Sequence, residues 1–293
     1  MIEKQDFALF YENFLEEAKN IGFISAKAIS FYEKKFIVCA FPYKDLQDQT
    51  IPFQNAGYIA PFAQRNYYRE SVKRLKNIVK KIRQIYGGEK SDYRIFCNSQ
   101  LDEKKIANDS GLGFLGRNSL VIIPEIGSSF VISAITIPFS LEKNYKNSTK
   151  NTTLFPLCEN CDKNTPPCVK ACPTNALKGD GKVILDRCIQ WYASGNGDFI
   201  PENIAKNWGN RLYGCTNCQD ACIYNKKLMQ GIDSNEGSLP AYIDIQKLLS
   251  MTNEEIKNFF KGTCLGFSWL GPEKIKRNAK LIMTNIQSGN LKV

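Results

Sequence analysis

The cysteines are the most informative residues of the chain, because eight of the eleven lie in two groups between residues 158 and 222. The first group has the pattern C-x2-C-x6-C-x3-C-P, and the second is a lone cysteine followed by C-x2-C-x3-C. In a bacterial two-cluster ferredoxin, the fourth cysteine of each run binds the other cluster. This rule assigns one [4Fe–4S] cluster to Cys158, Cys161, Cys168 and Cys222, and a second to Cys172, Cys188, Cys215 and Cys218. Two complete sets of thiolates predict a protein that transfers electrons.

Zinc and disulfide bonds are the alternative uses of the same cysteines. Zinc also binds four thiolates, often from paired C-x2-C units, but the C-x3-C-P ending and the crossed arrangement favour iron–sulfur clusters. A disulfide framework is disfavoured, because the segment MIEKQDFALFYENF lacks the apolar core of a signal peptide and a chain of 293 residues needs no covalent staples. The departures from ferredoxins are the gap DKNTPP between Cys161 and Cys168, which is polar and contains proline, and Ile223, where a proline would often follow Cys222. We expect this gap to form a loop.

The absence of histidine narrows the chemistry. It excludes a histidine general base, histidine metal ligands and a Rieske cluster. Any proton donor must therefore be Asp, Glu, Tyr, Cys, Lys or a bound water. The formal net charge is +10. Two oxidised clusters of about −2 each reduce it to about +6, a basic balance that permits nucleic acid as a partner without establishing it.

The densest basic stretch, residues 69–86, is predicted to form an amphipathic helix. Its apolar residues recur at helical spacing and are Val72, Leu75, Val79, Ile82 and Tyr86. The lysines and arginines then lie on the outer face, where they are either only solvated or in contact with phosphate groups.

The longest apolar stretch, SLVIIPEIGSSFVISAITIPF, is interrupted by Pro124, Glu125 and Gly127. It therefore predicts two buried strands rather than a membrane span. We expect a soluble cytoplasmic protein without a membrane partner.

The rest of the sequence predicts strands interleaved with helices. Residues 5–20 carry apolar residues on one helical face (Phe7, Phe10, Phe14 and Ala18), and Gly22 stands where that helix should end. Strands are expected over 36–43 and 93–97, and a helical turn over 101–108. A polar linker over 140–153 precedes the cysteine-rich segment. Near the C-terminus, Thr252 and Glu255 predict a capping box, and residues 272–286 predict an amphipathic helix.

A glycine-rich bend over residues 111–118 contains G-x-G-x-x-G at Gly111, Gly113 and Gly116. A dinucleotide fingerprint requires a strand immediately before it and a long helix after it. Here a helical sequence precedes the bend and the strand SLVII follows it, so a nicotinamide cofactor is not expected. The glycines would still allow the backbone to approach another flat or polar ligand.

Taken in this order, these segments resemble those of the epoxyqueuosine reductases, which are cobalamin-dependent iron–sulfur enzymes related to reductive dehalogenases. The matching segments are GLGFLGRNSLVIIPEIGSSFVISAITI, ACPTNAL, DRCIQWY, RLYGCTNCQDAC followed by YN, and RNA at residues 277–279. The resemblance covers most of residues 20–280 and implies an α+β chain. It implies a nitroreductase-like, cobalamin-binding α/β domain over 1–145, a ferredoxin-like domain with two [4Fe–4S] clusters over 150–230, and a C-terminal helical segment over 231–293.

The same resemblance implies an activity, cofactors and partners. Members of the family reduce the epoxide of epoxyqueuosine in the wobble nucleoside of certain transfer RNAs, the last step of queuosine synthesis. The implied partners are transfer RNA and an external electron donor such as a ferredoxin or flavodoxin. Cobalamin is expected near a set of residues in the bend, the following strand and the second cysteine group: Gly116, Arg117, Asn118, Val121, Ile122, Ile123 and Thr216.

The chain departs from the family at the proton donor. Similar enzymes carry an aspartate in a pattern like D-N-S-P-I-D-E, whereas this chain reads CNSQLDE from Cys97. Cys97 is therefore the candidate catalytic residue, because a thiol can donate a proton near neutral pH. Shifting the alignment by one residue would place Asn98 there, and Asp102 or Tyr67 could substitute for the acid. Cys97 could equally be a small buried strand residue.

Two further departures leave the substrate open. Longer family members end in helical repeats that help to grip transfer RNA, and the chain resembles a short form without them. The segment FAQRNYYRE (62–70) also differs from the family's usual stretch. The alternatives are a related cobalamin and iron–sulfur reductase acting on a different small substrate, and an electron-transfer protein without cobalamin chemistry. Cys39 and Cys264 have no expected ligand role and are predicted to be buried.

Overall fold

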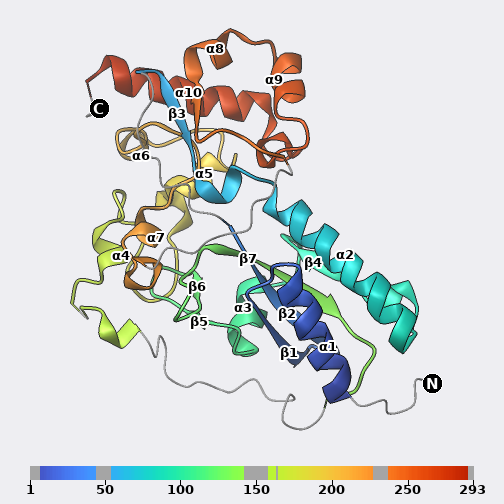
Figure 1. Cartoon of the computed structure of the whole chain (residues 1–293). Coiled ribbons are helices and arrows are strands. Elements are labelled where there is room, and N and C mark those ends of the chain that lie inside the picture. Colours follow the sequence, from blue (N-terminus) through green and yellow to red (C-terminus); the bar gives the residue numbers. More distant parts are fainter. Residues whose placement is uncertain (1–6, 44–53, 142–157, 163, 227–236, 290–293) are drawn as a thin grey trace. The chain divides into compact units, whose positions relative to one another are not determined.

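A computed structural model of the chain describes residues 7–43, 54–141, 158–162, 164–226 and 237–289 (Figure 1). The chain forms two compact units, each assembled from separate stretches. Unit 1 comprises Met1–Tyr43, Tyr67–Asn160 and Tyr224–Ile232, and unit 2 comprises Lys44–Asn66, Cys161–Ile223 and Asp233–Val293. The expected domain boundaries at 145–150 and 230–231 lie outside the described residues, as does the expected linker from residue 142 onwards.

The described part of unit 1 is built around an antiparallel sheet with the strand order β1-β2-β7-β4. The strands are β1 (Ser25–Phe31), β2 (Lys34–Pro42), β4 (Ile95–Cys97) and β7 (Phe130–Thr136). Tyr32 and Glu33 join β1 to β2 with positive φ values of 46° and 63°, as a tight two-residue hairpin requires. The strands expected over 36–43 and 93–97 are confirmed.

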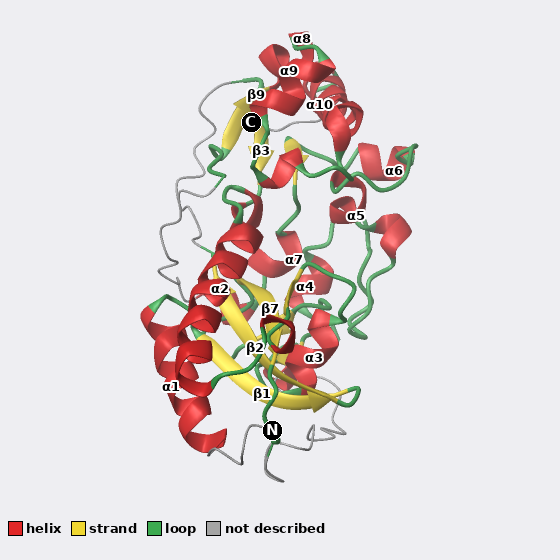
Figure 2. Ribbon diagram, turned by 90° about the vertical axis from the view of Figure 1, so that its right-hand side faces the viewer, coloured by secondary structure: helices red, strands yellow, loops and turns green. Residues whose placement is uncertain are grey.

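Helices cover both faces of this sheet (Figure 2). On one face lie α1 (Phe7–Asn20) and α2 (Tyr67–Tyr86), and Ser71 of α2 donates a hydrogen bond to Ser133 of β7 at 2.9 Å. On the other face α3 (Glu103–Asp109) packs into a hydrophobic cluster with the alternate residues of β2. The sheet therefore has an apolar core on each side.

The predicted helix faces are those that the structure buries. The four apolar residues expected on one face of α1 are buried, and Gly22 follows the helix with a φ of 95°. In α2, Leu75, Val79, Ile82 and Tyr86 are buried together with Ile78, whereas Val72 is partly exposed. The exposed face of α2 carries Lys73, Lys76, Lys80 and Lys81.

The glycine-rich bend forms the start of a small hairpin after α3. Strand β5 (Phe114–Leu115) pairs with β6 (Val121–Ile122) in antiparallel register. The bend therefore leads into a strand rather than into a long helix, as the sequence indicates.

The described part of unit 2 contains a small sheet with the order β8-β3-β9. Its strands are β3 (Ala56–Ile59), β8 (Arg211–Tyr213) and β9 (Tyr242–Asp244). The helices are α4 (Pro167–Lys170), α5 (Ile189–Ala193), α6 (Glu202–Ala205), α7 (Asn217–Asp220), α8 (Ile245–Ser250), α9 (Asn253–Phe259) and α10 (Gly271–Gln287). The predicted capping box of Thr252 and Glu255 begins α9, and the predicted C-terminal helix is α10. Within the described residues, every helix is too short or too polar to cross a membrane.

Candidate functional site

Short helices and turns of unit 2 carry most of the cysteines in the two predicted ligand sets. Cys168 lies in α4 and Cys218 in α7, and these two helices pack together. Cys188 is the residue immediately before α5, and Cys215 follows β8. The first backbone N–H groups of a short helix have no partner within the helix, so they can donate to a bound thiolate.

Five of these cysteines are close enough to influence one another's protonation. Burial, and to a smaller extent the negative charges of Cys215, Cys188, Cys168 and Cys172 in that order, together raise the pKa of Cys218 to about 12. Burial also raises the pKa of Cys188, with smaller contributions from Cys215 and Cys172. These neighbours include the other three members of the set assigned to one cluster by the ferredoxin rule, and also Cys168, which the rule assigns to the other cluster.

A bound cluster would lower the pKa of these thiols instead, because iron stabilises the thiolate form. In the described residues, no group of three or more His, Cys, Asp or Glu side chains lies close enough to hold a single metal ion. The thiolates of a [4Fe–4S] cluster each bind a different iron. They therefore stand farther apart than the ligands of one zinc ion.

The other predicted set combines Cys158 with Cys161, Cys168 and Cys222. Cys158 is buried and begins a single turn at Cys158–Asn160, a stretch that belongs to unit 1. Cys161, Cys168 and Cys222 belong to unit 2, and Cys168 and Cys222 are buried.

The sulfur of Cys172 in the second set receives a hydrogen bond. The backbone N–H of Ala176 donates to Sγ of Cys172 at 3.2 Å, and Oγ1 of Thr174 lies 3.8 Å from the same sulfur. The thiol of Cys215 itself donates to Oδ1 of Asn217 at 3.5 Å, a contact that a metal-bound thiolate would lose. Hydrogen bonds to cluster sulfurs raise the reduction potential, so the contacts of Cys172 fit a site that accepts and passes on electrons.

Thr216, predicted to approach a cofactor, lies between Cys215 and α7. Its hydroxyl donates to a carboxylate oxygen of Asp220 at 2.6 Å, and the side chain is buried. The hydroxyl is therefore oriented by α7.

The hairpin of the glycine bend closes tightly on itself. A Cβ at Gly116 would stand 2.5 Å from Cδ1 of Ile122, and one at Gly113 would stand 2.7 Å from the carbonyl oxygen of Ile122. Asn118 is buried, and its Oδ1 accepts from the N–H of Leu120 at 3.2 Å. Packing of β5 on β6 thus explains these two glycines without a ligand.

The hairpin is the region expected to hold cobalamin. The side chains of Val121, Ile122 and Ile123 are buried, and those of Val121 and Ile123 belong to the core cluster of unit 1. The partly exposed side chains of the hairpin are both apolar and polar: Leu115, Arg117, Ser119 and Leu120. A corrin, which is a flat apolar ring edged with amide groups, would meet both kinds of side chain here.

Cys97, the candidate catalytic residue, is the last residue of β4 and is partly exposed. Its thiol donates to the carbonyl oxygen of Ile132 at 3.5 Å. Burial raises the pKa of the thiol well above its usual range, and the negative charge of Glu103 raises it further. The thiol therefore holds its proton throughout the neutral range.

Glu103 is a carboxyl close enough to influence Cys97, and the sequence did not single it out. Burial raises its pKa above the ordinary 4.5, although hydrogen bonds from the backbone N–H and hydroxyl of Ser99 and from Asn98 act in the opposite direction. The two acids considered from the sequence have other roles. Asp102 caps α3 by accepting from the N–H of Lys105 at 3.0 Å, and Tyr67 is buried with its ring beside that of Tyr43.

The segment that follows Cys222 is anchored in unit 1. The ring of Tyr224 packs edge-on against Phe114 of the bend. Asn225 accepts from the N–H of Ser128 at 2.6 Å and donates to its hydroxyl at 2.9 Å. Gly127 lies so close to this amide that a Cβ would stand 2.0 Å from Oδ1 of Asn225. The YN pair therefore packs on the hairpin and on the turn before β7.

Comparison with known proteins identifies the cysteine-rich segment. Residues 157–225 match the family model of the 4Fe-4S double cluster binding domain, a range that includes all eight cysteines of the two predicted sets. The prediction of iron–sulfur clusters is thereby confirmed, and the assignment of each cysteine to a cluster stays a prediction.

Relatives match the chain beyond this segment. The epoxyqueuosine reductase of Staphylococcus aureus is 33% identical over 192 residues, which are 63% of this chain and 45% of that protein. The chain spans about half the length of the first relatives it matches, at 45% to 46%.

Solved structures match the fold. A structure of epoxyqueuosine reductase from Bacillus subtilis, with a catalytic aspartate loop swung out of the active site, has a TM-score of 0.78 at 23% identity and covers 96% of this chain and 83% of that one. A structure of epoxyqueuosine reductase with an epoxyqueuosine-modified tRNA-Tyr stem loop has a TM-score of 0.77 at 24% identity and the same coverage. The predicted α+β fold with a double-cluster segment is confirmed.

Proposed function

We propose that this chain, which resembles the epoxyqueuosine reductases in sequence and in fold, is an iron–sulfur and cobalamin-dependent oxidoreductase that reduces epoxyqueuosine to queuosine in transfer RNA. The observation that carries the proposal is the combination of a double-cluster segment over 157–225 with a fold match over 96% of the chain. The match to a reductase structure that contains a modified tRNA stem loop supports transfer RNA as the substrate.

The two clusters would deliver the electrons that the reaction consumes. Removing an epoxide oxygen consumes two electrons and two protons, forms an alkene and releases water. A [4Fe–4S] cluster passes one electron at a time, so two clusters in series suit a two-electron reduction. We assign the electron donor to the class of ferredoxins or flavodoxins and place the enzyme in the cytoplasm, where such donors and transfer RNA occur.

The hairpin after α3 is the proposed place of the cofactor. Gly116, Arg117 and Asn118 would hold cobalamin at the bend, with the strand residues Val121, Ile122 and Ile123 behind them, and Thr216 stays a predicted contact. When bound, reduced cobalamin supplies a strong carbon nucleophile. The protein contributes orientation, protons and the exclusion of water.

Protons are assigned to Cys97 and Glu103. The raised pKa keeps a proton on Sγ of Cys97 and makes this thiol a weaker acid than a free one, and burial also raises the pKa of Glu103. The carboxyl is the stronger acid of the pair, so it can resupply the thiol after a proton is lost.

The proposed domains keep the bounds expected from the resemblance: a cofactor-binding α/β domain over 1–145, a double-cluster domain over 150–230 and a C-terminal helical segment over 231–293. The compact units of the structure divide the chain differently, because unit 2 also includes Lys44–Asn66 and the C-terminal segment from Asp233.

A second candidate function is a related cobalamin and iron–sulfur reductase that acts on a different small substrate. The observation that favours it is Cys97, because the related Bacillus subtilis structure has a catalytic aspartate loop. A weaker proton donor suits a substrate whose reduction depends less on general acid catalysis.

The test uses anaerobically reconstituted full-length protein. Titration with cob(II)alamin, followed by electron paramagnetic resonance, should give a stoichiometric protein-bound signal. Turnover on transfer RNA that carries epoxyqueuosine should then yield queuosine by nucleoside mass spectrometry. A bound corrin without queuosine would reject the transfer RNA substrate in favour of the second candidate. A spectrum of free cobalamin with both clusters present would reject both reductases.

A further inference from the structure

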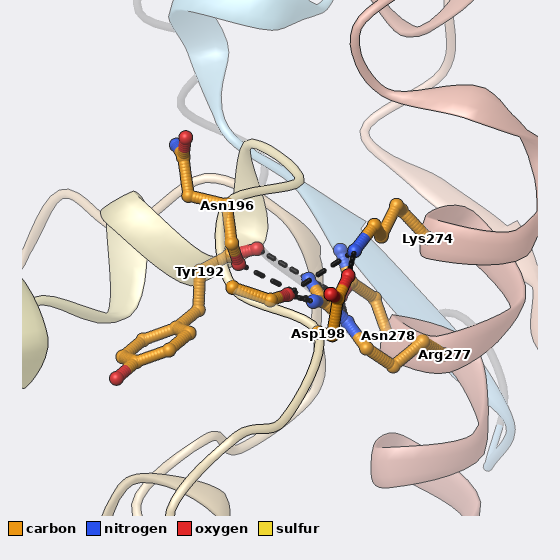
Figure 3. A network of polar contacts seen from close by, with 7 residues as sticks. Tyr192, Asn196, Asp198, Lys274, Arg277 and Asn278 are labelled. Carbon is orange, nitrogen blue, oxygen red and sulfur yellow. Dashed lines mark hydrogen bonds and ion pairs between the residues drawn. The ribbon is translucent and has the colours of Figure 1, made fainter.

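A polar network joins the end of α5 and the residues after it to α10, through Arg277 and Lys274 (Figure 3). Cys188 immediately precedes α5, and Cys215 follows β8. Gln190 of α5 links the two directly, because its Oε1 accepts from the backbone N–H of Cys215 at 3.1 Å. The separation of these two predicted ligands thus depends on how α5 and β8 are held.

Asn278 of α10 joins α5 to β8 through a single side chain. Its Nδ2 donates to the carbonyl oxygens of Ala193, at the end of α5, and of Leu212, in β8, both at 3.1 Å. The side chain is fully buried. Both hydrogens of the amide are therefore used, one on each ligand-bearing segment.

Arg277 holds the chain beyond α5. Its guanidinium donates to the carbonyl oxygens of Tyr192, Gly197 and Asn196, and also to Oδ1 of Asn278. The last contact points the Nδ2 of Asn278 towards Ala193 and Leu212. The carbonyl groups at the end of a helix have no partner within the helix. Here two neighbouring side chains of α10 donate hydrogen bonds to them.

The neighbouring turn of α10 adds an ion pair. Lys274 donates to Asp198 at 2.5 Å and to the carbonyl oxygen of Gly197 at 3.2 Å. Asp198 is exposed, so this pair contributes little. The buried contacts of Arg277 and Asn278 are the ones that restrain the ligand segments.

We infer that Arg277 and Asn278 are positioning residues for the cluster held by Cys172, Cys188, Cys215 and Cys218. The inference rests on the proposed assignment of these ligands. A helix of seventeen residues, packed into the core of unit 2 through Ile275, Ala279 and Ile282, provides the rigid element. Groups behind metal ligands commonly change metal retention by about 10-fold or more when they are removed.

The experiment compares Asn278→Leu, which keeps the shape and removes both donors, with Asn285→Leu. Asn285 lies on the same helix, is buried, and donates to the carbonyl oxygen of Ala205 at 3.0 Å, in α6 rather than in a ligand segment. Three quantities are measured on reconstituted full-length protein: the rate of iron release to a chelator, the midpoint potential of each cluster, and the melting temperature.

Asn278→Leu should accelerate iron release about 10-fold and shift the potential of one cluster only. Asn285→Leu should lower the melting temperature without either effect. In a Cys188→Ala background, which lacks the second cluster, Asn278→Leu should no longer accelerate release. If Asn278→Leu does not fold, Arg277→Lys keeps the charge, cannot bond all of these carbonyls at once, and allows the same comparison.

Equal acceleration in both backgrounds, or equal effects of the two asparagine variants, would overturn the inference and leave the ligand assignment intact. Retention of two full clusters by Cys188→Ala would overturn the assignment, and the inference with it.

Discussion

The side-chain amide of Gln190 accepts a hydrogen bond from the backbone N–H of Cys215, at 3.1 Å. The donor belongs to a predicted cluster ligand, and the acceptor lies two residues beyond another, Cys188. One side chain therefore couples two segments that are distant in sequence. The effect of this hydrogen bond on stability can be measured without knowing the substrate.

Gln190→Met removes this acceptor and keeps a side chain of similar length. The loss of one such hydrogen bond should lower the free energy of unfolding by about 1 kcal/mol. Urea unfolding of the reconstituted protein measures the change. Gln246→Met is the matched control, because that amide accepts an exposed hydrogen bond from Asn55 at 3.1 Å and should matter by less than about 0.5 kcal/mol. Equal losses of unfolding free energy in the two variants would show that the Gln190 hydrogen bond stabilises the protein no more than an exposed one.

Cys188→Ala should remove one cluster and leave the other. The iron content of the reconstituted protein should then fall from about eight to about four atoms per chain. Cys264→Ala is the control, since Cys264 is buried, donates to the carbonyl oxygen of Arg65 and lies outside both predicted sets. A fall in iron content in both variants would point to general misfolding rather than to ligation.

Cys97→Ala should lower kcat about 100-fold on the proposed substrate, because a proton-donating group is lost. Cys97→Asp should match or exceed the activity of the parent, since a carboxylic acid gives up a proton more readily than this thiol. Cys39→Ala tests for a structural effect, because Cys39 and Cys97 both pair with Ser133 from opposite sides in the sheet. Cys39 is fully buried. Unchanged kcat in both Cys97 variants would remove this residue from the mechanism.

The raised pKa of Glu103 makes a prediction about pH. Burial favours the protonated carboxyl in the folded state, so this group stabilises the fold below its ordinary pKa and loses that contribution as the pH rises through the raised value. Glu103→Gln should therefore gain stability relative to the parent as the pH rises above the ordinary pKa of the carboxyl, 4.5. Urea unfolding across this range measures the difference. Glu254→Gln, at an exposed position of α9, controls for the loss of one charge, and an identical trend there would refute the assignment.

Gly127→Ala should destabilise unit 1 by more than Gly111→Ala. Both glycines have positive φ values, 84° and 71°, so both substitutions carry a conformational cost of about 1 to 2 kcal/mol. A Cβ at Gly111 has no atom within 4 Å, whereas one at Gly127 meets Asn225 and the carbonyl oxygen of Tyr224. The difference between the two free energies of unfolding, from urea titrations, measures the close approach alone. Equal losses would mean that the segment after Cys222 moves aside without cost.

The sequence by itself determined those features that depend on near neighbours in the chain. Cysteine spacing indicated iron–sulfur clusters, because ligands for a cluster come from short local runs. Helical periodicity indicated the buried faces of α1 and α2, and Thr252 with Glu255 indicated the start of α9, because caps and periodicity act within a few residues.

Tertiary structure alone decided the contacts between distant segments. Strand β3 pairs in parallel with β8, about 150 residues later in the chain, and no local pattern indicates such a pairing. Val121 and Ile123, expected from the resemblance near a cofactor, turn their side chains into the core of unit 1. The proximity of Glu103 to Cys97 likewise depends on packing. So do the hydrogen bonds that Arg277 and Asn278 donate to the ligand segments. Such contacts arise only when the fold closes loops of many residues, so their partners are set by the whole structure rather than by adjacent residues.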